Sequence, residues 1–252
     1  MSPIPKRLQK EPLIEAVWQV LFEPEANKPL GEILPGLLYS AKSKESTDSN
    51  QVQLHRLPPA EIPRQVAMMD PNLRYAVKYR IESADSPFVM QVGERVVTLN
   101  CRRPYAGWQI FKEQISILAK TLEDSGLALN PQGHSLRYID LVCLDSPPTL
   151  APLKATLQIG DHAIMAQRLR LRVELPDNEH LHVLQVVCPG EVIQGEGTMR
   201  GLLIDLETVP TLKEKSWSSL LGGLDDLHDA VKNMFFEHVL SEEAIRRLNP
   251  EY

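Results

Sequence analysis

The chain has 252 residues, of which 43% are hydrophobic and 24% are charged, and its formal net charge is -6. These proportions are those of an ordinary globular protein. No apolar run approaches the roughly 20 residues that a membrane-spanning helix needs. The basic segment 1–12 lacks the apolar core of a secretory signal, so we expect a cytoplasmic protein without membrane contact. The acidic balance disfavours non-specific binding to nucleic acid, which depends on neutralising phosphates.

The three cysteines, Cys101, Cys143 and Cys188, are far apart, and each lies in or beside an apolar run typical of a strand. Such residues usually pack as small, reduced, buried hydrophobes. No Cys-x-x-Cys pair is present, so the sequence does not predict a zinc ribbon.

The first half of the chain predicts a long strand, a helix and then three shorter strands. Alternation of apolar and polar residues indicates a strand over 13–22. A helix is expected over 30–41, weakened by Pro35 and Gly36, before a polar, mobile loop at 42–50. The remaining strands should cover 74–82, 88–92 and 95–101, with a tight turn at Gly93-Glu94 between the last two.

Residues 107–125 form the clearest predicted helix of this half. Apolar side chains recur there at spacings of three and four, which makes one stripe for packing on a sheet: Trp108, Phe111, Ile115, Leu118 and Leu122. Ile110, Ile117 and Ala119 should widen the stripe. Gly126 suits the position that follows a helix end.

The second half follows the same order of elements. Its strands are expected at 135–145, 154–159, 164–175, 181–187 and 202–207. Asp177-Asn178 should turn the middle pair. A long helix is expected over 220–240, followed by a short helical tail that Ser241 caps.

This repetition predicts an α+β fold made of two similar halves, residues 1–130 and 131–252. Each half should be a curved antiparallel sheet packed on a long amphipathic helix, in the manner of a duplicated helix-grip unit. The second half also carries the helix that closes the chain at its C-terminus.

Four stretches together resemble a sporadically distributed bacterial family of roughly this length that has no assigned activity. They are residues 10–24 with PLIEAVWQVLF, 136–145 with LRYIDLV, 201–209, and 227–248 with FFEHVLSEEAIRRL. Asp140 stands where that family usually has asparagine. The resemblance implies a patchily inherited bacterial protein of defence-type gene neighbourhoods, and it brings no catalytic residues to this chain.

The most distinctive charged pattern is QRLRLRV, in which Arg168, Arg170 and Arg172 alternate with leucines. On a strand, residues two apart share one face and lie about 7 Å from each other. Such a row of guanidinium groups suits phosphates or carboxylates, which accept paired hydrogen bonds. The alternative is an amphipathic strand whose arginines are solvated and whose leucines enter the core.

His180 and His182 also lie two residues apart, on the neighbouring predicted strand. A third metal ligand at a recognisable spacing is missing, so no metal site is predicted. Counting back from an Asp177-Asn178 turn places both histidines on the leucine face. A slip of one residue would place them with the arginines instead.

Arg102, Arg103 and Tyr105 lie with Trp108 at the junction between a strand and the first long helix. Basic and aromatic groups together suit stacking on a base and pairing with a phosphate. The alternative is that Trp108 anchors the helix while the arginines face water. The glycine-rich stretch 190–201 matches neither a phosphate-binding loop nor a dinucleotide fingerprint, so it is predicted to be a flexible loop.

Three functions remain open, and no catalytic residue or cofactor is predicted. The preferred one is a non-enzymatic binding protein with a protein partner, acting as an accessory or regulatory component of a multi-component bacterial system. The second is nucleic-acid or nucleotide binding through the arginines. The third is an enzyme with a dispersed site in a pocket between sheet and helix. The sequence does not set the oligomeric state.

Overall fold

The computed structural model describes residues 3–23, 28–45, 51–70, 73–127, 129–194, 197–212 and 216–252. It confirms the α+β class, with a large antiparallel sheet and a few helices. None of the helices in these ranges has the length and apolar character to cross a membrane.

The chain forms two compact units, each assembled from segments that are distant in sequence. Unit 1 consists of Met1–Ile14, Leu136–Thr211 and Asp225–Tyr252, and unit 2 of Glu15–Ser135 and Leu212–Leu224. Unit boundaries fall inside β2, β7 and α5.

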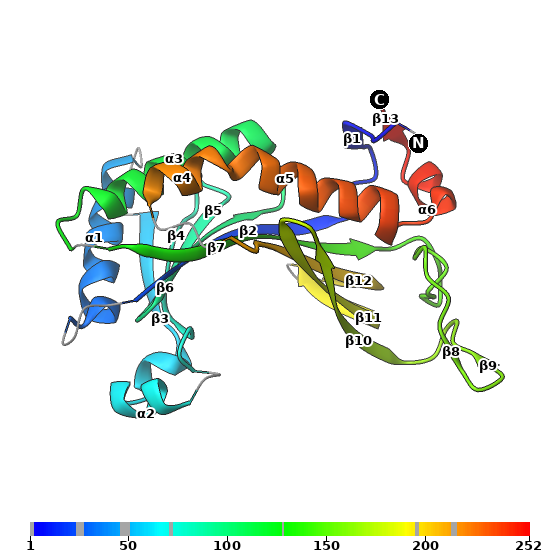
Figure 1. Cartoon of the computed structure of the whole chain (residues 1–252), viewed down its shortest axis with the longest axis horizontal. Helices are drawn as coiled ribbons and strands as arrows, with labels where there is room; N and C mark the ends of the chain where they lie inside the picture. Colours follow the sequence, from blue (N-terminus) through cyan, green and yellow to red (C-terminus); the bar gives the residue numbers. More distant parts are fainter. Residues whose placement is uncertain are drawn as a thin grey trace. The chain divides into compact units, whose positions relative to one another are not determined.

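Unit 2 contains antiparallel strands in the order β2-β6-β5-β4-β3. The strands are β2 (Leu13–Phe22), β3 (Val52–Arg56), β4 (Val77–Ser83), β5 (Phe88–Gly93) and β6 (Val96–Arg102). The helices are α1 (Leu30–Glu45), η2 (Pro58–Glu61), α2 (Arg64–Met69), α3 (Trp108–Glu123) and α4 (Trp217–Gly222), shown in Figure 1. The sequence patterns had predicted neither β3, η2 nor α2.

The core of unit 2 lies between its strands and α3. The inward side chains of β2 are buried as the alternation predicts, and so is the α3 stripe of Phe111, Ile115, Leu118, Ala119 and Leu122. Burying each large apolar side chain contributes roughly 1.5–3 kcal/mol. Ile110 and Ile117 are 49% and 44% exposed, so the predicted widening of the stripe is wrong at those two positions.

The β5–β6 turn lies one residue later than predicted, at Glu94-Arg95, because Val92 pairs with Val97. Glu94 is buried, and its carboxylate accepts hydrogen bonds from Lys78 Nζ at 2.9 Å and from the Gly31 amide, at the start of α1, at 3.3 Å. The turn therefore anchors the start of α1 to the strands. The predicted loop at 42–50 is also corrected: residues 42–45 continue α1, and 46–50 lie outside the described residues.

Unit 1 contains antiparallel strands in the order β10-β11-β12-β7. They are β7 (Pro131–Val142), β10 (Leu169–Asp177), β11 (His180–Gln194) and β12 (Gly197–Pro210). Two small pairs join β8 (Gln158–Ile159) to β9 (His162–Ala163) and β1 (Arg7–Leu8) to β13 (Pro250–Glu251). The helices are α5 (Leu224–Asn233), the π-helical segment η3 (Met234–Val239) and α6 (Glu242–Arg247).

Helix α5 and segment η3 cover one face of the unit 1 strands (Figure 1). Their buried side chains recur every four residues: Leu227, Val231, Phe235 and Val239. The single helix predicted over 220–240 is wrong, because the helix breaks at the Gly222-Gly223 pair and winds more widely from Met234 onward. In that wide turn the Leu240 amide donates to the Phe235 carbonyl at 2.9 Å. The Ser241 cap is confirmed, since its hydroxyl accepts from the Ala244 amide at 3.2 Å.

Gly93 offers a direct test of the close pairing between β5 and the start of β4, where it lies opposite Val77. A side-chain Cβ at Gly93 would lie 2.3 Å from the Ala76 carbonyl oxygen, whereas a Cβ at Gly36 in α1 would meet nothing within 4 Å. We expect Gly93→Ala to lower the free energy of unfolding by about 1–3 kcal/mol. Gly36→Ala, the matched control, should leave it unchanged or raise it by up to about 1 kcal/mol. Urea unfolding of both variants checks this, and equal effects would contradict the close approach of Gly93 to the Ala76 carbonyl.

Candidate functional site

The predicted arginine row lies on an exposed face of unit 1. Arg170 and Arg172 are exposed and share one face of β10, while Arg168 is exposed just before the strand begins. Leu175 pairs with His182, so the turn is Asn178-Glu179 and not Asp177-Asn178. The pairing of β10 with β11 is thus shifted by two residues from the predicted one, and a shift of two leaves every side chain on its predicted face of the strand. The histidines lie on the leucine side, as predicted.

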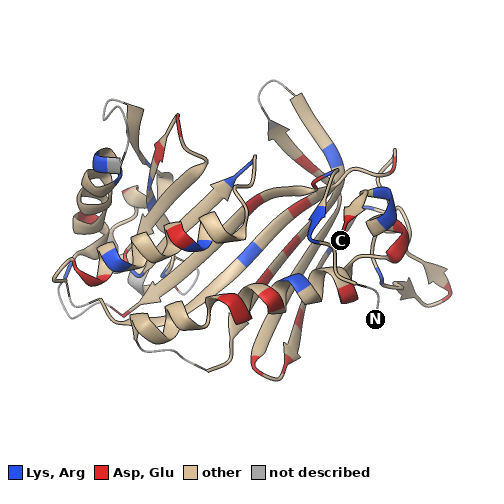
Figure 2. Cartoon of the chain, turned by 90° about the horizontal axis from the view of Figure 1, so that it is seen from above, with Lys and Arg blue, Asp and Glu red and all other residues tan. Residues whose placement is uncertain are grey.

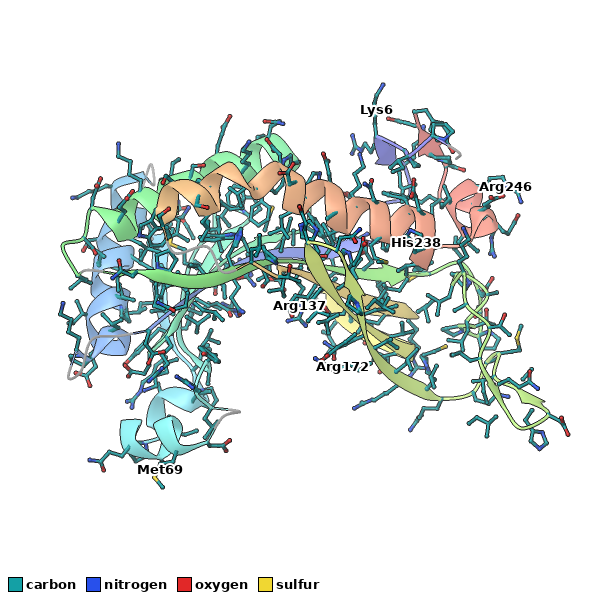
Figure 3. All side chains as sticks on the ribbon, viewed as in Figure 1. Lys6, Met69, Arg137, Arg172, His238 and Arg246 are labelled. Carbon is teal, nitrogen blue, oxygen red and sulfur yellow. The ribbon has the colours of Figure 1, made fainter. Side chains whose placement is uncertain are left out.

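The arginine face carries charges of both signs. Arg172 forms an ion pair with Glu174 at 2.6 Å on the same strand. Arg137 of β7 donates hydrogen bonds from two guanidinium nitrogens to the two carboxylate oxygens of Asp205 on β12, and its Nε lies 2.6 Å from one of these oxygens. Arg137 and Arg172 lie on the side of the strands away from the π-helical segment that carries His238 (Figure 3). This face is therefore a charge-balanced surface and not a purely cationic row.

Arg102, Arg103 and Tyr105 belong to unit 2, so the sequence-predicted site residues are divided between the two units. The Arg102 guanidinium pairs with Glu82 at 2.9 Å. Tyr105 packs edge-on against Phe111 with ring centroids 6.2 Å apart, and Trp108 does the same at 6.4 Å. These contacts support the part of the alternative in which Trp108 anchors α3, whereas Arg102 is half-buried in its ion pair instead of facing water.

The cysteine prediction holds for two of the three residues. Cys101 and Cys188 are buried, and burial raises the pKa of the Cys188 thiol. Cys143 is exposed, so the prediction that it packs as a buried hydrophobe is wrong. It follows the last residue of β7, directly after three consecutive buried residues, 140–142.

The glycine-rich stretch 190–201 is also corrected. Apart from residues 195–196, which lie outside the described part of the chain, it belongs to strands β11 and β12. Gly190 pairs with Gly201 after a register shift that follows Val187. A Cβ at Gly190 would lie 2.5 Å from Leu203 Cβ, and one at Gly201 would lie 2.6 Å from the Val142 carbonyl. These two glycines permit close strand approach.

A pocket that the sequence analysis missed lies in unit 1, between the β10–β11 turn and the helical face of α5 and η3. Its volume is about 430 Å³. The lining residues are Asp177, Glu179, His182, Asp226, Asp229, Ala230, Asn233, Met234, Glu237 and His238. Figure 2 shows acidic residues along α5 and at the tip of the β10–β11 hairpin. The only sequence signal for this pocket was the acidic tip of the β10–β11 hairpin, and only the fold places that tip beside α5 and η3.

His182 is the most buried of these lining side chains, with 1% of its surface exposed. Its Nδ1 lies 2.8 Å from the Thr208 hydroxyl, and its Nε2 lies 4.0 Å from the nearer Asp177 oxygen. Burial lowers the pKa of His182, and the neighbouring His180 lowers it further. A hydroxyl, an imidazole and a carboxylate in this order suggest nucleophilic catalysis. Thr208, however, is 0% exposed and no substrate reaches it.

Metal binding through this cluster finds no support in the geometry. Within the described ranges, no group of three or more histidine, cysteine, aspartate or glutamate side chains is arranged to hold a metal ion.

Tyr138 and His228 join the strands of unit 1 to α5. The Tyr138 hydroxyl and His228 Nδ1 are 3.0 Å apart. Burial, with a smaller contribution from the Lys232 charge, lowers the pKa of His228 to about 4. In unit 2, burial likewise lowers the pKa of His134 to about 4, and His134 accepts a hydrogen bond from Trp18 Nε1 at 3.2 Å.

Comparison with known proteins adds no functional information. No protein-family model matches the chain, and no curated protein matches it.

The buried His134 and the half-buried His228 predict a loss of stability in acid. Their folded pKa values of about 4 lie below the ordinary value of 6.5, so the unfolded chain takes up protons first as the pH falls. The free energy of unfolding should be flat above pH 6.5 and should decrease between pH 6.5 and 4, by at most about 3 kcal/mol for each histidine. Urea unfolding at several pH values measures this decrease. His228→Gln should make it shallower and the exposed control His162→Gln should not.

Proposed function

We propose that this chain is a non-enzymatic binding protein that docks a protein partner along the open edge of strand β10. The observation that carries the proposal is a long edge strand whose apolar row is only partly covered. We further propose that it acts in the bacterial cytoplasm as an accessory component of a multi-component system, which the family resemblance of its four sequence stretches supports.

Strand β10 lies at the end of the unit 1 strand order and, among the described residues, pairs with β11 alone. It is nine residues long, Leu169–Asp177. An edge strand of this length leaves a row of backbone donors and acceptors open to a further strand. Addition of a partner strand to such an edge is a common mode of peptide recognition, with backbone hydrogen bonds for affinity and side chains for specificity.

The apolar row on β10 supports docking of a protein in particular. Leu169, Leu171, Val173 and Leu175 face the helix side of the strands, yet all four are only half-buried. Their partners on β11, by contrast, include the buried His182, Val186 and Cys188. The apolar side chains are therefore largely covered on β11 but only partly covered on β10, the last strand. A partner strand that extends the sheet beyond β10 would bury the remaining apolar surface of Leu169, Leu171, Val173 and Leu175.

The opposite face of β10 favours a protein over a nucleic acid. Nucleic-acid affinity grows with the number of phosphates that free cationic groups neutralise. Here Arg172 already pairs with Glu174, and Arg137, three strands along on the same face, already pairs with Asp205. A partner protein with mixed charges fits such a surface better than a polyanion does.

The similar construction of the two units supports a further proposal about their origin. Each unit combines antiparallel strands with helical segments that carry a buried apolar stripe, α3 in one and α5 with η3 in the other. We propose that the two halves arose as a duplication of one sheet-plus-helix plan.

Site-specific photocrosslinking tests the docking surface. A photoreactive amino acid replaces Arg170 on β10 in one protein and the exposed Gln109 on α3 in a control protein. Irradiation in bacterial cells should give a discrete crosslinked protein from position 170 and none from position 109. Leu171→Lys, placed in the same chain as the position 170 probe, should reduce that product about tenfold or more, because it puts a charge into the apolar row.

Two outcomes would contradict the proposal. A crosslink to nucleic acid that disappears after nuclease treatment, or in an Arg168, Arg172 double glutamine variant, would favour the nucleic-acid alternative. Absence of any discrete product at position 170, in a protein that remains folded by circular dichroism, would remove β10 as a docking surface.

A further inference from the structure

The sequence of strand β10 is complementary to itself when two copies of the strand run in opposite directions. The strand covers Leu169–Asp177, nine residues, so Val173 is its middle residue. Placing Val173 of one chain opposite Val173 of a second chain therefore pairs the whole strand across a twofold axis. In such an interface every contact occurs twice, because residue i of one chain meets residue j of the other and j meets i.

The charges of the exposed face match in this register. Arg172 of each chain lies opposite Glu174 of the other. Within one chain the two side chains already form an ion pair at 2.6 Å. Two copies would thus join two such pairs into a ring of four charges with alternating sign. Opposite charges directly across antiparallel strands stabilise the pairing, and like charges destabilise it.

The apolar face of β10 matches in the same register. Leu171 of each chain lies opposite Leu175 of the other, and Val173 lies opposite itself on the axis. All three side chains are half-buried in the single chain, so the pairing brings partly exposed apolar surface together. Residues directly opposite each other in an antiparallel pair share a face of the sheet, and the apolar and charged faces of the two copies therefore each continue across the axis.

The neighbouring registers lose this match. The next registers that keep the faces shift the pairing by two residues, which moves the axis by one residue. With the axis at Arg172 that arginine faces itself, and with the axis at Glu174 two carboxylates face each other. Charge thus selects the register centred on Val173. Pro176, which has no amide hydrogen, lies there opposite Arg170 near the end of the paired stretch, so the middle of the strand keeps all its backbone donors.

We infer that the protein that docks on β10 is a second copy of this chain, paired antiparallel about Val173. The inference rests on the proposed function, because it names the occupant of the same open edge. Pairing of two copies also covers the exposed backbone groups of both edges at once. Since the faces are kept, α5 and η3 of the two copies lie on the same side of the joined strands.

Two charge reversals in separate chains test the inference by sedimentation equilibrium. Arg172→Glu places Glu opposite Glu and Glu174→Arg places Arg opposite Arg, so each variant alone should dimerise about tenfold or more weakly than the unchanged chain. An equimolar mixture of the two variants should regain the affinity of the unchanged chain, because both cross-strand pairs are again of opposite charge. The intrachain pair stays broken in the mixture, so a purely structural role of these residues would give no recovery.

Arg200→Glu and Glu191→Arg are the matched controls. Arg200 and Glu191 form an exposed ion pair at 2.9 Å between β12 and β11, beyond the part of β11 that pairs with β10. Each control variant should dimerise like the unchanged chain. Circular dichroism of all four variants shows that they are folded.

A disulfide test locates the axis, in a chain whose exposed Cys143 is replaced by serine. Val173→Cys should give a disulfide-linked dimer on mild oxidation, because the Cα atoms of facing residues lie about 4.5–5.5 Å apart, within disulfide range. Leu169→Cys should not, because four residues on each side of the axis separate its two copies by about 27 Å. A disulfide-linked dimer at 169 and none at 173 would overturn the inference.

Three results of sedimentation would also overturn it: an unchanged chain that stays monomeric, a mixture that shows no recovery, or controls that weaken as much as the variants of β10. The crosslink from position 170 separates these failures from failure of the proposed function. A product of twice the mass of the chain supports the second copy. A discrete protein product of another mass overturns the second copy and leaves docking at β10 in place, whereas no product at all overturns both.

Discussion

The packing of α5 and η3 on one face of the unit 1 strands is the constraint on which that unit depends. Leu227, Val231, Phe235 and Val239 bury the apolar stripe, and the burial of four such side chains exceeds any single polar contact in free energy. The Tyr138–His228 hydrogen bond then fixes the position of the helix along the strands. Burial lowers the pKa of His228 to about 4, so the imidazole in this contact is neutral at pH 7.

The same packing divides unit 1 into surfaces with different chemistry. On the helix side it brings the acidic face of α5 next to the acidic turn of β10 and β11, which creates the pocket around His182. At the outer strand the helix covers the apolar row incompletely, so β10 combines an open backbone edge with half-buried leucines. On the far side, ion pairs such as Arg137–Asp205 balance the charges that the arginine pattern alone would suggest are free.

Periodicity predicted most of the regular elements, because a buried face needs repeated apolar side chains: β2 and α3 follow directly from this requirement. It did not predict β3 and α2, in which few side chains are buried. The wide winding of η3 was also missed, because its residues fit an ordinary helical pattern. The extra residue in the turn shows only in the structure, where the Leu240 amide donates to the Phe235 carbonyl. Leu240 and Ser241 then contact residues 151–153. The sequence did not predict the pocket. In the sequence, Asp226 is fully explained as an acidic residue in the first turn of a helix. Its place in the pocket wall follows only from the fold, which puts the β10–β11 turn, some fifty residues earlier in the chain, across the pocket from it.

Helix α5 docks tightly enough to hold a neutral His228 against Tyr138 of the strands. The most direct measurement is the protonation state of His228 in the folded protein, read from long-range proton–nitrogen correlations of the imidazole ring as the pH is lowered from 7.5 to 5.5. A pKa of about 4 predicts a ring that remains neutral throughout this range, with one protonated and one unprotonated nitrogen. A ring that titrates near its ordinary value of 6.5, while the protein stays folded, would show that the helix leaves His228 in water and would contradict the account.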